Sequence, residues 1–226
     1  MKPITGSWFE FRHHAAWEGE HYNPSLRAYS AGQWAAMVDD MAALGMDTLV
    51  LMCSSLCYET EAESYAPVTV FPAPADMACP EAMDVMMAKA AEHRMSVFLS
   101  IGFYGNWMKP VDNMKSSQVQ ERAFEAARTL YAAYRENPAF VGWYLPDETE
   151  AGPAFSPVFL DYVNRYAAFL RALDPGKKIL IAPYGTQKIV PDETFVEQLR
   201  NLDVDYIAYQ DEVGVQKSTP DQTGAY

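Results

Sequence analysis

The sequence predicts a (β/α)₈ barrel, an α/β fold, of which about five and a half βα units are present. Six short strand-like runs alternate with five helical patterns along residues 1–226. Such alternation is typical of consecutive βα units and a parallel sheet. Polar and aromatic residues collect after the C-terminal end of nearly every run, which is where barrel enzymes keep their active sites.

The strand-like runs are short and rich in β-branched or aromatic residues. The second run is continuously apolar, as expected for a strand that is buried on both faces of a parallel sheet. A long loop over residues 54–79 follows it, and long loops in compact domains tend to be functional. The six runs lie at residues 4–11, 48–52, 96–101, 140–145, 178–183 and 205–210.

Helical patterns fill the segments between these runs. Ser30 and Gln33 fit a capping box at the start of the first helix. An apolar stripe follows from Trp34, and Gly45 supplies the C-terminal stop. No clear element is expected over residues 214–226. Three further helices are expected to begin at Pro80, Ser117 and Ser156, and a fourth, short helix is expected to contain Phe195.

A doubly wound open sheet is the competing architecture. The Gly-x-Gly-x-x-Gly turn of dinucleotide folds does not follow the first run, and no phosphate-binding loop motif occurs. A barrel needs eight units, so the seventh and eighth are missing. We therefore expect residues 1–226 to be a single barrel domain that is truncated at its C-terminus and has an unpaired edge. An open sheet would instead make the chain complete.

Composition narrows the classes of partner. Half of the residues are hydrophobic, and the formal net charge is −13. Such a negative surface repels phosphate backbones and anionic membranes, so nucleic acid and membranes are not expected partners, whereas a sugar is compatible. No apolar stretch is long enough to span a bilayer. Without an N-terminal apolar run, the chain is cytoplasmic as numbered, or secreted if a leader was removed.

The three cysteines indicate neither a disulfide scaffold nor a zinc site. Cys53 and Cys57 have C-x₃-C spacing, but no second pair accompanies them, and Cys79 stands alone. An odd and sparse set of this kind is typical of ordinary buried or loop thiols. No metal or other cofactor is expected, and the oligomeric state is open.

The sharpest functional signal is the segment Gly-Trp-Tyr-Leu-Pro-Asp-Glu at residues 142–148. Strand alternation places the odd-numbered residues of 140–145 beneath the helices and the even-numbered ones toward the barrel axis. Continuing the strand brings Glu148 to the axial side of the rim. Among Tyr144, Trp107 and Tyr184 its carboxyl would be partly desolvated, which raises the pKa and suits a general acid. Asp147 or Glu148 could instead cap the next loop or pair with an arginine.

At this point the sequence resembles a known family. Residues 4–8, 45–51 and 142–148 resemble bacterial glycoside-hydrolase-like barrels, with domain-of-unknown-function family 4434 as the match, and residues 209–215 are similar to that family's sixth-strand block. The resemblance implies a glycosidase whose acid/base is Glu148. Asp147 replaces the asparagine that contacts the sugar 2-hydroxyl in the wider retaining glycosidase clan. That clan's nucleophile follows strand seven, which lies beyond residue 226 here.

Glycoside hydrolysis needs a second carboxylate. Three acids follow strand-like runs and are candidates, and each could instead be a loop cap or an ion-pair partner. Asp211 is preferred because Gln210 and Asp211 follow the sixth run directly. The other two are Glu10 and Glu212.

Further side chains are expected to contact the sugar. His13 could hydrogen-bond a hydroxyl, and Glu10, Asp147, Tyr144 and Gln210 lie near strand ends. Aromatic rings offer stacking faces for a pyranose. Periodicity places Trp34 and Trp143 in the core instead. The candidate stacking residues are Trp8, Trp17, Tyr58, Tyr104, Trp107 and Tyr184.

Three functions fit these observations. The first is a glycoside hydrolase with Glu148 as general acid/base and Asp211 as the second acid. The second is a sugar-binding barrel without catalysis, because Asp147 replaces the asparagine and no nucleophile is visible. The third is a metal-dependent sugar isomerase or hydrolase that uses His13 or His21 with Glu148 and Asp211.

Overall fold

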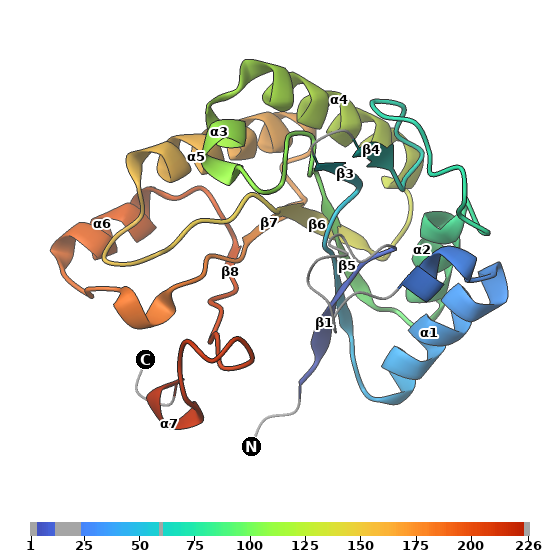
Figure 1. The fold of residues 1–226 in the computed structure, drawn as a ribbon, viewed down its shortest axis with the longest axis horizontal. Helices are drawn as coiled ribbons and strands as arrows, with labels where there is room; N and C mark the ends of the chain where they lie inside the picture. Colours follow the sequence, from blue (N-terminus) through green and yellow to red (C-terminus); the bar gives the residue numbers. More distant parts are fainter. Residues whose placement is uncertain (1–3, 12–23, 59–60, 224–226) are drawn as a thin grey trace.

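In the computed structural model, which describes residues 4–11, 24–58 and 61–223, six parallel strands form one curled sheet. Helices cover the outer, convex side of the sheet, so the arrangement is that of a half-barrel (Figure 1). The first and last strands in the sheet order are its two edges. In order across the sheet the strands are β1 (Gly6–Phe9), β2 (Thr48–Leu51), β5 (Ser96–Ser100), β6 (Phe140–Leu145), β7 (Lys178–Ile181) and β8 (Tyr206–Ile207).

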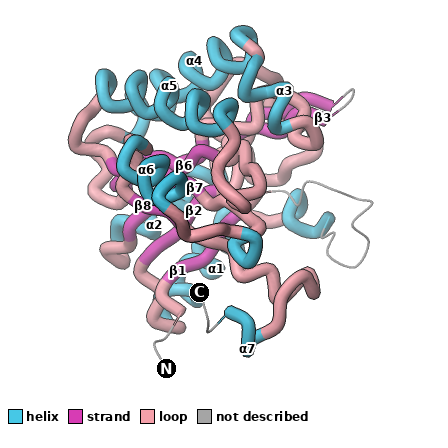
Figure 2. Tube along the Cα trace, turned by 90° about the vertical axis from the view of Figure 1, so that its left-hand side faces the viewer, coloured by secondary structure: helices cyan, strands magenta, loops and turns pink. Residues whose placement is uncertain are grey.

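The predicted alternation of strands and helices is confirmed, and the sheet has the topology of an incomplete TIM barrel. α4 and α5 lie along one side of the sheet, while the short α7 stands apart from the helices that cover it (Figures 1 and 2). No helix within the described residues is both long and apolar enough to cross a bilayer. The helices are α1 (Ala31–Ala43), α2 (Ala82–Glu92), α3 (Pro110–Lys115), α4 (Ser117–Tyr134), α5 (Pro157–Leu173), α6 (Glu193–Asn201) and α7 (Pro220–Thr223), with 3₁₀ turns at Pro24–Ala28 and Thr186–Lys188.

The sequence did not predict a hairpin and two short helices that the structure contains. The long loop after β2 contains an antiparallel hairpin, β3 (Ser55–Tyr58) paired with β4 (Glu61–Ser64). The loop after β5 contains α3, and the C-terminal tail contains the four-residue α7. The hairpin and α3 lie on loops that leave the C-terminal ends of β2 and β5, which is the end of the barrel where a site is expected.

Capping side chains fix where the helices begin. Ser30 and Gln33 form the predicted capping box of α1. Gly45 then follows the helix with φ of +85°, a conformation that glycine adopts without strain. Ser156 caps α5 as predicted, since its Oγ accepts from Phe159 N at 3.2 Å. α4 begins at Ser117 as predicted, and the residue before it, Ser116, caps the helix.

The core has an outer layer, between sheet and helices, and a smaller inner layer inside the half-barrel. Trp143 is buried in the outer layer and Tyr144 in the inner layer, as predicted. The prediction for the start of β6 was wrong: Phe140 packs in the outer layer and Val141 against the inner one. The cause is a bulge, because Val97 pairs with Phe140 whereas the next residue of β5 pairs with Gly142.

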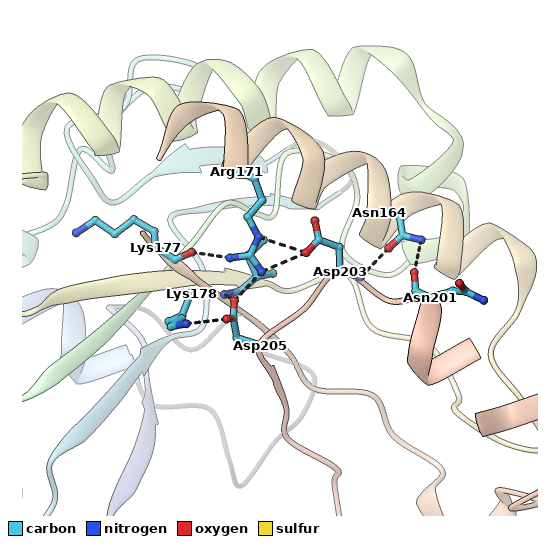
Figure 3. Close-up of polar contacts among 8 residues, drawn as sticks. Asn164, Arg171, Lys177, Lys178, Asn201, Asp203 and Asp205 are labelled. Carbon is cyan, nitrogen blue, oxygen red and sulfur yellow. Dashed lines mark hydrogen bonds and ion pairs between the residues drawn. The ribbon is translucent and has the colours of Figure 1, made fainter. Parts of the chain in front are cut away.

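An ionic network joins the N-terminal ends of β7 and β8 to the end of α5 (Figure 3). Arg171 of α5 binds Asp203 at 3.2 Å and Asp205 at 2.8 Å. Asp205 also accepts from Lys178 Nζ and from the backbone N–H of Ile179, each at 2.9 Å. Although burial opposes ionisation, these donors lower the pKa of Asp205. Asp205 therefore ties the edge strand β8 to β7 at the end of the barrel remote from Glu148.

Asp205→Ala is expected to lower the free energy of unfolding by about 2 to 3 kcal/mol, because the buried Ile179 N–H and the Arg171 guanidinium lose their shared acceptor. Asp203→Ala is the matched control, since its carboxylate is half exposed and should cost less than about 1 kcal/mol. Urea denaturation of both variants measures the difference. Equal losses would show that Asp205 has no special role in this network.

Candidate active site

Glu148 lies three residues beyond the end of β6, and both of its carboxylate oxygens are held by hydrogen bonds. Tyr144 Oη donates to Oε1 at 2.6 Å, and Gln210 Nε2 donates to Oε2 at 2.6 Å. The same Gln210 Nε2 also donates to the carbonyl oxygen of Ala182 at 2.8 Å. Tyr144 belongs to β6, Ala182 follows β7 and Gln210 follows β8. The residues that orient this carboxyl group thus come from three neighbouring strands or from the segments that follow them.

Burial raises the pKa of Glu148 above its ordinary value, and the hydrogen bonds from Tyr144 and Gln210 oppose this shift only in part. Burial also raises the pKa of the Tyr144 hydroxyl, to which the charge of Glu148 adds. Tyr144 therefore remains a proton-bearing donor near neutral pH. A carboxyl group with a raised pKa and fixed orientation is suited to general acid catalysis.

Two hollows meet at Glu148. One, of about 220 Å³, is walled by Phe103, Trp107, Pro110 and Tyr184 and is called here the Trp107 hollow. The other, of about 300 Å³, is walled by Trp8, Ala182 and Gln210 and is called here the Trp8 hollow. Met52 and Glu148 border both hollows. Trp8 is 39% exposed and stands edge-on to Tyr144, with ring centroids 6.0 Å apart.

Asp147 lies on the other side of the chain from these hollows. Its side chain is 5% exposed, and its Oδ1 accepts from Asn113 Nδ2 at 3.0 Å. Burial raises the pKa of Asp147 to about 7, with the hydrogen bond from Asn113 opposing and the charge of Glu148 adding to the shift. The predicted contact of Asp147 with sugar therefore does not agree with its placement in this structure.

The candidate second carboxylates are dispersed. Asp211 is exposed and borders a third hollow, of about 470 Å³, together with Tyr184 and Gln210. Glu212 is buried and accepts from Gly185 N at 2.6 Å and from Lys217 Nζ at 2.9 Å. Burial opposes ionisation of Glu212, but these two donors lower its pKa, which fits the ion-pair role.

The remaining predicted contacts fall into three groups. Glu10 follows β1 and is half-buried, so it stays a candidate. Tyr104 is 1% exposed, with its hydroxyl 3.0 Å from Ser54 Oγ, so its ring has no free face for a sugar. The prediction for Tyr104 was wrong because the loop after β5 turns this ring into the core. His13, His21 and Trp17 lie outside the described residues.

Sequence reasoning missed several residues that shape the site. Met52 borders both hollows, and Phe103 and Pro110 wall one of them. Met52 ends the second apolar run, so its place at a strand terminus was an available signal. Over residues 4–11, 24–58 and 61–223, no group of three histidine, cysteine or acidic side chains is arranged to hold a metal ion.

A larger cavity, of about 690 Å³, lies at the opposite, N-terminal ends of the strands. Phe98, Leu180 and Tyr206 line it, and none of the described residues in its lining is acidic or a histidine. Barrel sites form at the C-terminal ends of strands, where Glu148 and its two donors are found. We therefore take the Glu148 region as the candidate active site.

The curled sheet of six parallel strands, with helices on its outer side, is that of an incomplete TIM barrel. The chain belongs to the family described as Domain of unknown function (DUF4434), whose model matches residues 4–226. The search of curated proteins gave no match.

Three solved structures with a similar fold are described as glycosidases. A protein assigned as an α-L-fucosidase from Bacteroides thetaiotaomicron is 17% identical, with a TM-score of 0.66, over 92% of this chain and 64% of that one. The endo-1,4-β-mannanase from Rhizomucor miehei is 12% identical, with a TM-score of 0.56, over 88% and 68%. A β-galactosidase from Halorubrum lacusprofundi is 12% identical, with a TM-score of 0.54, over 98% and 42%. At these identities the likeness shows the fold, and the chain spans less than two thirds of the first protein's length.

Proposed function

We propose that this chain belongs to a glycoside hydrolase in which Glu148 is the general acid/base. The observation that carries the proposal is that Glu148, with a raised pKa, stands between two hollows that each present a tryptophan. A proton donor between two sugar-sized recesses is placed to act on the bond that joins two rings. The glycosidase-like fold supports a carbohydrate as the ligand.

In the proposed reaction, the protonated carboxyl of Glu148 donates its proton to the glycosidic oxygen as the bond from that oxygen to the anomeric carbon breaks. A protonated oxygen accepts hydrogen bonds poorly. Protonation at Oε2 is feasible because Gln210 Nε2 keeps a second acceptor in the Ala182 carbonyl. Once the proton has left, Tyr144 and Gln210 stabilise the carboxylate, which can then take a proton from water.

The second carboxylate of the reaction is a separate proposal. Asp211 is the candidate within the described residues, although it borders the third hollow rather than the two at Glu148. The family resemblance instead implies a glutamate after a seventh strand. The described sheet has six strands with β1 and β8 at its edges. We propose that further βα units complete the barrel there and carry that glutamate.

Trp107→Ala and Trp8→Ala are each expected to weaken glycan binding by about fivefold, because an aromatic face in contact with a sugar ring contributes on the order of 1 kcal/mol. Tyr206→Ala is the matched control. This tyrosine is also exposed, at 51%, but lines the cavity at the opposite end of the strands. Calorimetric titration measures the three affinities. A loss of affinity only in Tyr206→Ala would place the sugar at that other end.

The second candidate function is sugar binding without catalysis. Asp147 replaces the expected asparagine and is turned away from the hollows. Among the described residues, no second carboxylate borders the two hollows beside Glu148. The experiment that tests both functions is a glycan panel presented to the full chain, with calorimetry for binding and product analysis for hydrolysis. Hydrolysis supports the first function, and binding without products supports the second. If no glycan binds, both are wrong.

A further inference from the structure

Asn113 is a buried amide that joins two walls of the Trp107 hollow. Its side chain is 5% exposed, and Nδ2 donates both to the carbonyl oxygen of Asn106 at 2.9 Å and to Asp147 Oδ1 at 3.0 Å. Asn106 belongs to the loop that carries Trp107. Asp147 is the residue before Glu148. One amide group therefore connects the aromatic wall of the hollow to the strand end that presents the carboxyl.

The loop between β5 and α3 packs closely on this amide. A Cβ atom at Gly105 would collide with Asn113 Oδ1, so loop and helix meet without a gap. On its other side, the loop is held by the β3 hairpin, since Trp107 N donates to the carbonyl oxygen of Cys57 at 3.0 Å. The aromatic wall is thus fixed between the hairpin and Asn113.

Asp147 is the fixed acceptor in this arrangement. It lies two residues beyond the end of β6, and it is only 5% exposed to solvent. Removing the acceptor would leave the buried Asn113 amide with one donor unsatisfied, at a cost of about 1 to 3 kcal/mol. The segment that can relax to relieve this cost is α3 with the preceding loop, which moves Trp107 relative to Glu148.

We infer that Asp147 is a positioning residue: through Asn113 it sets the place of the Trp107 wall opposite Glu148, and it does not itself touch the ligand. The consequence for catalysis rests on the proposed function. The position of Trp107 is independent of the proposed function, so it can be measured without any glycan.

The test is acrylamide quenching of tryptophan fluorescence in the full chain. Each protein is compared with the same protein carrying Trp107→Phe, and the difference isolates the signal of Trp107. Asp147→Leu is expected to increase acrylamide quenching of Trp107 by about twofold or more, because the wall loses its anchor and opens. Asp147→Asn should retain the shielding of Trp107, because its amide oxygen still accepts from Asn113.

Asn113→Leu breaks the same connection from the donor side and should also expose Trp107. It carries the test if Asp147→Leu does not fold, and thermal unfolding identifies the folded variants. Unchanged quenching in folded Asp147→Leu or Asn113→Leu would overturn the inference, as would equal exposure in Asp147→Asn and Asp147→Leu. If Trp107 responds as expected but no glycan binds, the proposed function alone is wrong. If glycans are hydrolysed and Trp107 does not respond, the inference alone is wrong.

Discussion

Glu148→Gln is expected to lower the rate of glycan hydrolysis by about 10² to 10⁴-fold, the usual contribution of a positioned general acid. The amide has nearly the same shape and still accepts from Tyr144, so the fold and the glycan affinity should change little. It cannot donate a proton with the acidity of a carboxyl group. The measurement is kcat for the most reactive glycan of the panel, together with its affinity by calorimetry.

Glu150→Gln is the matched control for that experiment. Glu150 lies two residues further along the same segment, and its carboxylate pairs with Lys188. Its loss should leave the rate within about twofold, because a solvent-exposed ion pair contributes little. If Glu148→Gln hydrolyses the glycan as fast as the unmodified protein, the assignment of Glu148 is wrong.

Asp147→Asn is expected to raise the free energy of unfolding at pH 8 and to leave it nearly unchanged at pH 4. The pKa of Asp147 is about 7 in the folded protein, against an ordinary value of 3.8. Between these values the folded state binds the proton more tightly than the unfolded state does. The stabilisation by the protonated form is therefore complete below pH 3.8 and is lost as the pH rises through 7. With about 1.4 kcal/mol per pKa unit, the loss approaches about 4 kcal/mol at pH 8.

Urea denaturation of both proteins at several pH values measures this effect. Glu148 also has a raised pKa, but it is present in both proteins, so their difference isolates Asp147. Asp161→Asn is the control, since Asp161 is largely exposed in its pair with Arg165. A stability difference between Asp147→Asn and the unmodified protein that does not change with pH would contradict the buried, proton-binding state of Asp147.

Local patterns were sufficient to predict most of the elements. The six runs became the six parallel strands, and Ser30 and Ser156 cap helices as expected, because capping and periodicity act over a few residues. The same patterns placed Glu148 at a strand end. Its hydrogen bond with Gln210, 62 residues along the chain, arises only when β6 and β8 are brought together by the sheet.

The features that the sequence could not reveal depend on which face of a strand each residue occupies and on contacts between residues far apart in the sequence. The bulge opposite Val97 exchanged the faces of Phe140 and Val141, and no local feature of the sequence marks it. Tyr104 was expected to face a sugar but is buried, with its hydroxyl paired to Ser54 from another loop. The direction of Asp147 likewise depends on Asn113, in a helix that was not predicted.

The most direct test of the account is a crystal structure of the full chain carrying Glu148→Gln, with a bound oligosaccharide from the panel. The account predicts one sugar ring against Trp107, another against Trp8, and the linking oxygen within hydrogen-bond distance of the side chain at position 148. A sugar bound in the cavity around Tyr206, or rings that both lie on one side of position 148, would contradict it.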